Sequence, residues 1–155
     1  MRVFRAPPTD TAAVTQVAQA LGGEPDQATK AARSRFFAVV LQYDCQWKKE
    51  KMERELRARG GMSKKGCQLH FADQAEAEAL TGFVRNAVTP LGMKPSAEIP
   101  LFLSHHIPAL KEGYFWLGGG AINLKLGVRT DDFVSCLQPV VADVTFKEGC
   151  ETGVG

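Results

Sequence analysis

Apolar residues along the chain alternate between strand-like and helical spacing. The continuous run at 36–41 (FFAVVL) holds two aromatic and two β-branched residues, and a run of this length is typical of a strand buried on both faces. Cys67, Leu69 and Phe71 alternate with polar residues, which predicts a half-buried strand. We therefore expect the centre of a β-sheet at 36–41.

Helical spacing appears in segments with recognisable starts and stops. Capping residues predict a helix at 9–21 and a second, short helix at 26–32. Asp73, with Glu76 at the capping-box position, predicts a longer helix whose apolar stripe continues to Pro90. Helices thus dominate the start of the chain and flank the first strands.

The second half of the chain is richer in strands. Pro100 within the first of these segments suits an edge strand, because proline cannot donate to a ladder. Gly118, Gly119 and Gly120 predict a hairpin turn instead of a phosphate-binding loop, since a strand pattern follows them. Residues 130–132 (TDD) can cap one short helical turn before Pro139. The predicted strands are 99–103, 114–117, 121–128 and 140–146.

The order of elements predicts an α+β fold, with N-terminal helices followed by a mixed β-sheet whose helices lie mainly on one face. The 155 residues are expected to form a single domain. Its parts are a helical segment (1–33), a βαβα unit (34–92) and a strand-rich half (93–155).

The cysteines and the hydropathy of the chain indicate the cellular compartment of the protein. The four cysteines are far apart and form no CxxC pair, so we expect free thiols in a reducing compartment. No run approaches the roughly 18 apolar residues of a membrane span, and the N-terminus lacks the apolar core of a secretory signal. A soluble, intracellular protein is predicted. It would be cytoplasmic, or organellar if the N-terminus is a short presequence, because no acidic residue precedes Asp10.

Charge is concentrated in a basic segment at 46–65, which we expect to form a helix from residue 46 that ends at Gly60 and Gly61 and is followed by a basic loop. Positions 48–65 hold eight Lys and Arg against three Glu, a net charge of +5, whereas the remaining chain has 11 basic and 14 acidic residues, a net charge of −3. RNA or another polyanion is the partner such a patch would attract. The candidate nucleic-acid-binding residues are Trp47, Lys48, Lys49, Lys51, Arg54, Lys64 and Lys65.

A simpler interpretation of the basic segment is a solvated helix face. Three Glu–Arg pairs stand at favourable i,i+4 spacing, each contributing about 0.2–0.5 kcal/mol to the helix. These pairs are Glu50–Arg54, Glu53–Arg57 and Glu55–Arg59. On that interpretation, the lysines would be the cations left free for a ligand.

Candidate catalytic and metal-binding residues are scattered. Cys67 and His70 have half the spacing of a zinc site, but three positions along a strand point to opposite faces. His105 and His106 lie in a loop where a catalytic base for a cysteine nucleophile would fit. The sequence does not show that any of these residues form one catalytic or metal-binding site, so we predict no catalytic residue, metal or cofactor.

Asp44 and Asp73 each follow a predicted strand and precede a helix. If the two strands were parallel neighbours, both carboxylates would meet at one sheet edge, where Mg²⁺ could bind. Both residues are equally explained as helix N-caps.

Three functional hypotheses follow. The first is a non-enzymatic binding or assembly module, a subunit of a larger complex that contacts RNA or another polyanion through 46–65. The second is a small intracellular enzyme with its site at Asp44/Asp73 or at His105/His106. The third is a purely structural subunit that assembles with copies of itself or with other proteins.

Overall fold

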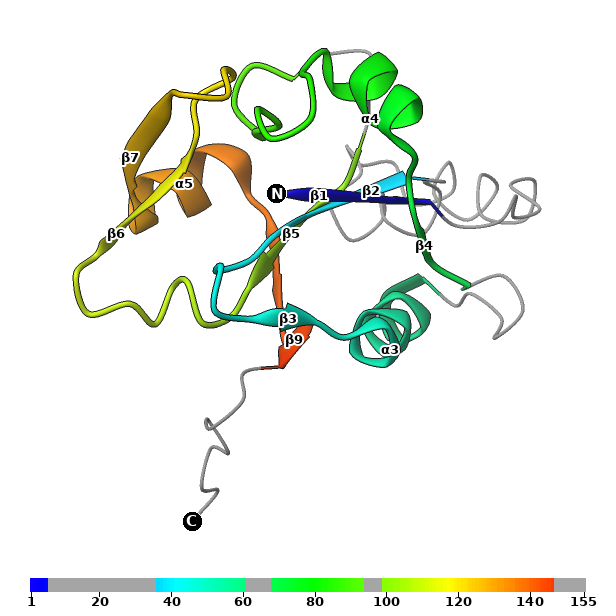
Figure 1. Cartoon of the computed structure of the whole chain (residues 1–155). Helices are drawn as coiled ribbons and strands as arrows, with labels where there is room; N and C mark the ends of the chain where they lie inside the picture. The colour runs from blue at the N-terminus through cyan, green and yellow to red at the C-terminus, as the bar shows by residue number, and fades with distance from the viewer. Residues whose placement is uncertain (6–35, 61–67, 94–98, 147–155) are drawn as a thin grey trace, which may run out of the picture.

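A mixed five-stranded β-sheet runs through the middle of the molecule (Figure 1). The computed structural model describes residues 1–5, 36–60, 68–93 and 99–146. In spatial order the strands are β4 (His70–Phe71), β1 (Arg2–Arg5), β2 (Phe36–Val40), β5 (Leu101–Ser104) and β8 (Val140–Ala142). Strand β1 is antiparallel to β2 and β4, whereas β2, β5 and β8 are mutually parallel. The predicted α+β class with a mixed sheet is confirmed.

Strand β2 occupies the position that its apolar run predicts. Phe37, Ala38 and Val39 are 0% exposed, because alternate side chains enter the hydrophobic cores on the two faces of the sheet. A strand covered on both sides reads as a continuous apolar run, which explains the sequence pattern.

Strand β5 is central, so the predicted edge position is wrong. It lies between β2 and β8, and all four of its residues are buried. Pro100 falls just before the strand, where its missing N–H removes no ladder bond and its carbonyl accepts from the Ala38 N–H at 3.0 Å. Proline at the first position outside a strand is compatible with a central place.

One face of the sheet is covered by helix α3 (Lys49–Gly60) and the small sheet of β3 (Gln46–Trp47) and β9 (Thr145–Phe146). Met52 and Leu56 pack from α3 onto the side chains of β2 and β5. The predicted basic helix therefore starts later than expected, because residues 46 and 47 pair with β9. The predicted strand at 140–146 is likewise divided between β8 and β9.

The other face carries α4 (Gln74–Thr81), α5 (Thr130–Leu137) and the hairpin of β6 (Tyr114–Gly118) and β7 (Lys125–Arg129). Leu117 from the hairpin and Phe133 from α5 bury against the side chains of β2 and β5. Two of the three helices in the described residues thus share a face, as predicted (Figure 1). The N-cap position of α5 is Arg129, which makes no side-chain cap.

Helix α4 begins as predicted and ends earlier. Asp73 and Glu76 form the expected capping box. Gly82 then adopts a left-handed conformation with φ of 82° and closes the helix, a common glycine C-cap. The residues up to Pro90 form turns, so the apolar positions near 87 are buried from a loop and the predicted extension of the helix is wrong.

Several predictions lie outside the described residues: the helices at 9–21 and 26–32, Cys67 and the lysines at 64 and 65. The organisation as one domain stays a prediction. None of the helices in the described part of the chain has the length and apolar character needed to cross a membrane.

Candidate functional site

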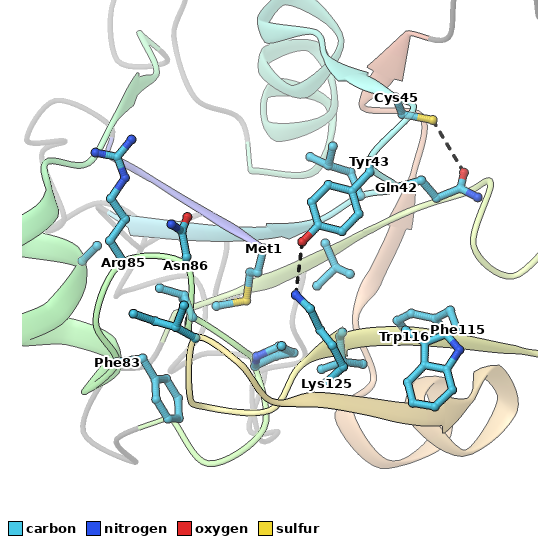
Figure 2. Close-up of a pocket in the computed structure, with 18 of the residues that line it drawn as sticks. Met1, Gln42, Tyr43, Cys45, Phe83, Arg85, Asn86, Phe115, Trp116 and Lys125 are labelled. Carbon is cyan, nitrogen blue, oxygen red and sulfur yellow. Dashed lines mark hydrogen bonds between the residues drawn. The ribbon is translucent and has the colours of Figure 1, made fainter.

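A cleft of about 760 Å³ opens over the carboxyl end of β2, on the side of the sheet that carries the hairpin (Figure 2). Six parts of the chain line it: Met1 at the N-terminus, the end of β2 with the segment after it, the segment from Phe71 into α4, the loop after α4, the loop after β5 and the β6–β7 hairpin. Small-molecule sites in proteins have volumes of about 300–1,000 Å³. The cleft is therefore large enough for a ligand of that size.

The inner wall of the cleft is apolar. Val40 from β2, Ile107 from the loop after β5 and Leu117 from β6 are buried and line it. Phe83 and Val88 add half-buried apolar surface from the loop after α4. An apolar part of a ligand would lose its contact with water here, which favours binding.

Polar and cationic side chains stand around this wall. Arg85 and Asn86 extend from the loop after α4, and both are exposed. On another part of the rim, Tyr43 and Lys125 point toward one another (Figure 2). The Lys125 Nζ lies 3.5 Å from the Tyr43 hydroxyl and 5.9 Å from the centroid of its ring. Two cations thus flank an apolar cavity, which suits a ligand that carries both apolar and anionic groups.

Helix α4 contributes carboxylates to the cleft. Asp73 lines it, but its Oδ1 accepts from the Glu76 N–H at 2.8 Å as the helix cap. Glu78 is half-buried, and its Oε1 accepts from the Gln74 side-chain amide at 2.9 Å. Glu78 is therefore held in place by its own helix and presents a negative charge to the cavity.

Close packing between two segments fixes the shape of the cleft. A Cβ at Gly118 would lie 3.2 Å from the Val88 carbonyl oxygen, and one at Gly120 would lie 3.0 Å from the Phe83 ring. Gly118 at the end of β6 and Gly120 after it therefore let the hairpin approach the loop after α4. In that loop Asn86 has φ of 69°, a left-handed conformation that asparagine tolerates better than most residues.

Cys45 is buried beside the cleft. Its thiol lies 3.6 Å from both the Gln42 Oε1 and the Asp44 Oδ1, and both Cys45 and Gln42 line the cavity. The predicted thiol state holds for Cys45 and for Cys136, which are free cysteines in the described part of the chain.

The two histidines lie apart from the residues that line the cleft. The rings of His105 and His106 stack with centroids 4.0 Å apart, and the His105 Nδ1 lies 3.6 Å from an Asp143 carboxylate oxygen. Their neighbour Ile107 does reach the cavity wall. The loop after β5 therefore contributes apolar surface to the cleft, while its His105 contacts Asp143 in the segment after β8.

The proposed pairing of Asp44 with Asp73 does not occur. Strand β1 lies between β2 and β4, so the two strands are not neighbours as a shared metal site would require. Asp73 caps α4, whereas Asp44 precedes β3 and cannot cap α3. Within residues 1–5, 36–60, 68–93 and 99–146, no group of His, Cys, Asp and Glu is arranged to hold a metal ion.

The described lysines of the basic segment each have a partner within the protein. The Lys51 Nζ donates to both carboxylate oxygens of Asp143 at 2.8 Å and to the Thr145 carbonyl at 2.9 Å. Lys49 forms an ion pair with Glu53 at 3.7 Å, and Lys48 lies over the ring of Phe146. The expectation that these three lysines are free is therefore wrong.

The remaining members of the basic segment have mixed environments. Trp47 is half-buried, and its ring centroid lies 5.4 Å from that of Phe71. Arg54 is exposed. Of the predicted helical pairs, Glu55–Arg59 forms at 3.2 Å, while Arg57 donates to the Glu53 carbonyl.

Sequence reasoning missed the cleft because its loop was assigned to a helix. Gly82, Asn86 and Pro90 within nine residues are signals for a helix stop and a turn. The apolar residues between them repeat at helical spacing, and this pattern predicts that the helix continues to Pro90. The cations at 85 and 125 stand alone in the sequence, so no local charge pattern indicated them.

Comparison with known proteins places the fold. No family model matches the sequence, and no curated protein is similar to it. Among solved structures, the chain is similar to hypothetical protein APE2540, with 24% identity, a TM-score of 0.59, and 94% of this chain and 91% of that one covered. It is also similar to a protein described as a "putative trans-editing enzyme for prolyl tRNA synthetase", with 20% identity, a TM-score of 0.59, and coverage of 92% and 85%. A third similar chain comes from a study of epitope backbone grafting by computational design, with 19% identity, a TM-score of 0.60, and coverage of 92% and 86%.

These similarities correct the first functional hypothesis. The hypothesis of a non-enzymatic module that contacts RNA or another polyanion through 46–65 is wrong, because a protein of similar fold is described as a "putative trans-editing enzyme for prolyl tRNA synthetase". No single segment of the sequence contains a catalytic set, which favours a non-enzymatic protein. The cleft is assembled from six separated segments, so no local pattern in the sequence indicates it.

Proposed function

We propose that this protein is a hydrolase that cleaves the ester between an amino acid and RNA, with the cleft as its active site. The observation that carries the proposal is the cavity of about 760 Å³ with an apolar wall and two cations at its rim. A similar structure described as a "putative trans-editing enzyme for prolyl tRNA synthetase" supports the choice of substrate. An aminoacyl ester combines an apolar or small side chain, an α-ammonium group and nearby phosphates, and the cleft offers a complement to each.

The residues of the cleft divide by the chemistry they can supply. The apolar wall at Val40, Ile107 and Leu117 would take the amino-acid side chain. The Glu78 carboxylate would pair with the α-ammonium group, while Arg85 and Lys125 would meet the phosphates of the RNA.

In the reaction, a water molecule adds to the ester carbonyl carbon and the bond to the ribose oxygen breaks. That ribose oxygen takes the proton that water loses. The Asn86 side-chain amide is the donor that would stabilise the negative charge on the carbonyl oxygen, since an amide N–H lowers the barrier when it points at the developing charge.

The test is the rate of amino-acid release from a panel of aminoacyl-tRNAs that includes mischarged species. We expect the wild type to deacylate at least one of them. Replacing Asn86 with Gly should lower kcat by about 10²–10³-fold, the typical effect of removing one such donor. Glycine suits the φ of 69° at this position, so the fold should be preserved.

Asn123→Gly is the matched control, because Asn123 is exposed and does not belong to the residues that line the cleft. It should retain wild-type kcat. Equal rates for the two variants, or no deacylation of any substrate by the wild type, would reject the proposal.

A further inference from the structure

The outward face of the β6–β7 hairpin carries exposed aromatic rings and cations. Strand pairing places Trp116 opposite Gly127 and Tyr114 opposite Arg129. Because side chains alternate along a strand, every second residue shares this face, while the residues between face the core. The exposed residues of the outward face are Tyr114, Trp116, Lys125, Gly127 and Arg129.

The indole of Trp116 lies against Gly127 of the neighbouring strand. A Cβ at Gly127 would lie 3.2 Å from its Cζ3 and 3.3 Å from its Cη2, so glycine makes the space that the ring occupies. Tyr114 meets the indole edge-on, with centroids 6.3 Å apart and an interplanar angle of 79°. Trp116 remains 64% exposed and Tyr114 47% exposed. The protein therefore positions these rings without burying them.

Two cations flank the rings. Lys125 belongs to the cleft rim and faces Tyr43. The Arg129 Nε lies 3.9 Å from an Asp132 carboxylate oxygen, with side chains 76% and 70% exposed. Such an exposed pair is weak and is readily exchanged for a phosphate. Tyr114, Trp116, Lys125 and Arg129 together form what we call the hairpin platform.

We propose that the hairpin platform binds unpaired nucleotides at the end of the RNA whose ester enters the cleft. The inference rests on the proposed function. Aromatic rings interleaved with cations match the alternation of bases and phosphates in a single strand. Trp116 and Lys125 also line the cleft, so a strand that leaves the cavity passes directly over the platform.

The experiment measures binding of a fluorescein-labelled, uncharged, single-stranded oligoribonucleotide by fluorescence anisotropy. Trp116→Ala should raise Kd by about 5- to 150-fold, the range found when a stacked aromatic is removed. Trp116→Phe, which keeps a stacking ring, should recover most of the affinity. Phe146→Ala is the matched control, since Phe146 is an exposed aromatic that contacts Lys48 of the basic segment.

The cations give a second, independent measurement. Phosphate contacts make binding weaker at higher salt, with a slope of about 0.7 per contact in a logarithmic plot for single strands. The double variant Lys125→Gln, Arg129→Gln should reduce that slope by about 1–2. An unchanged slope would contradict the platform even if a tryptophan variant were unstable.

The outcomes separate this inference from the proposed function because the oligoribonucleotide carries no ester. Trp116-dependent binding by a protein that deacylates nothing would support the platform and reject the hydrolase. Deacylation by a protein whose Trp116→Ala variant binds RNA as the wild type does would overturn the platform alone. Loss of RNA binding in Phe146→Ala, or self-association that depends on Trp116 without RNA binding, would also overturn it.

Discussion

The two faces of the central sheet use their side chains in opposite ways. On the α3 face, Lys49, Lys51 and Arg59 form ion pairs within the protein, and Met52 and Leu56 are at most 1% exposed. On the cleft face, a cavity remains open, and Trp116 and Tyr43 are 64% and 98% exposed.

This difference teaches that charge density along a sequence is a poor guide to a binding surface. The basic segment attracts attention because its cations are consecutive, yet its three described lysines all have partners nearby. The cations of the cleft are far apart in the sequence, at positions 85 and 125, and they line the same cleft only in the folded chain.

We expect the free energy of unfolding to depend more on the apolar side chains of the α3 face than on those of the cleft face. Leu56→Ala should lower the free energy of unfolding by about 2–5 kcal/mol, because the side chain is buried and leaves a cavity. Ile122→Ala, at a cleft-face position that is 64% exposed, should cost less than about 1 kcal/mol. Urea unfolding of both variants measures the contrast, and equal losses would show that the two faces do not differ in this way.

Glycine substitutions test how tightly the cleft is built. Gly118→Ala should lower the free energy of unfolding by about 1–3 kcal/mol, since the new Cβ would press on a backbone oxygen at 3.2 Å. Gly127→Ala meets only the indole of Trp116, which can move outward, so its cost should stay below about 1 kcal/mol. Thermal unfolding gives the order of the two, and the reverse order would mean that the loop after α4 yields more easily than Trp116.

Lysine substitutions test whether the charges on α3 are used internally. Lys51→Ala should destabilise by about 1 kcal/mol, below the usual 1.5–3 kcal/mol for bonds to charged groups, because its side chain is 33% exposed. Lys49→Ala removes a half-buried i,i+4 pair whose charged atoms lie 3.7 Å apart, and it should cost about 0.3–0.5 kcal/mol. Chemical denaturation of the two variants side by side checks this, and a larger effect at Lys49 would contradict the assignment.

Local sequence patterns predict the elements that depend on residues close to one another in the sequence. The buried run of β2 and the capping box at Asp73 and Glu76 follow from spacing and residue type alone. The hairpin was also predicted, although its turn is longer than the three glycines that indicated it.

The errors share a physical cause, which is tertiary packing that no local window contains. Gln46 and Trp47 were assigned to a helix because of the basic run that follows, but they pair with β9, a hundred residues away. Val88 repeats at helical spacing, yet it lies in a loop that packs against Gly118. The cleft forms through long-range contacts and through the early end of α4. No local sequence pattern therefore shows that its residues lie close together.

Two matched charge reversals in one deacylation assay test the central claim that the cleft is the active site. The double variant Arg85→Glu, Lys125→Glu reverses two charges at the cleft rim. The double variant Lys48→Glu, Lys49→Glu makes the same change in net charge at the first residue of α3 and the residue before it. We predict that the cleft-rim variant loses at least about tenfold in kcat/KM, since each lost charge-assisted contact costs about 1.5–3 kcal/mol, while the α3 variant keeps wild-type kcat/KM. Loss of activity in the α3 variant with full activity in the cleft-rim variant would contradict the account.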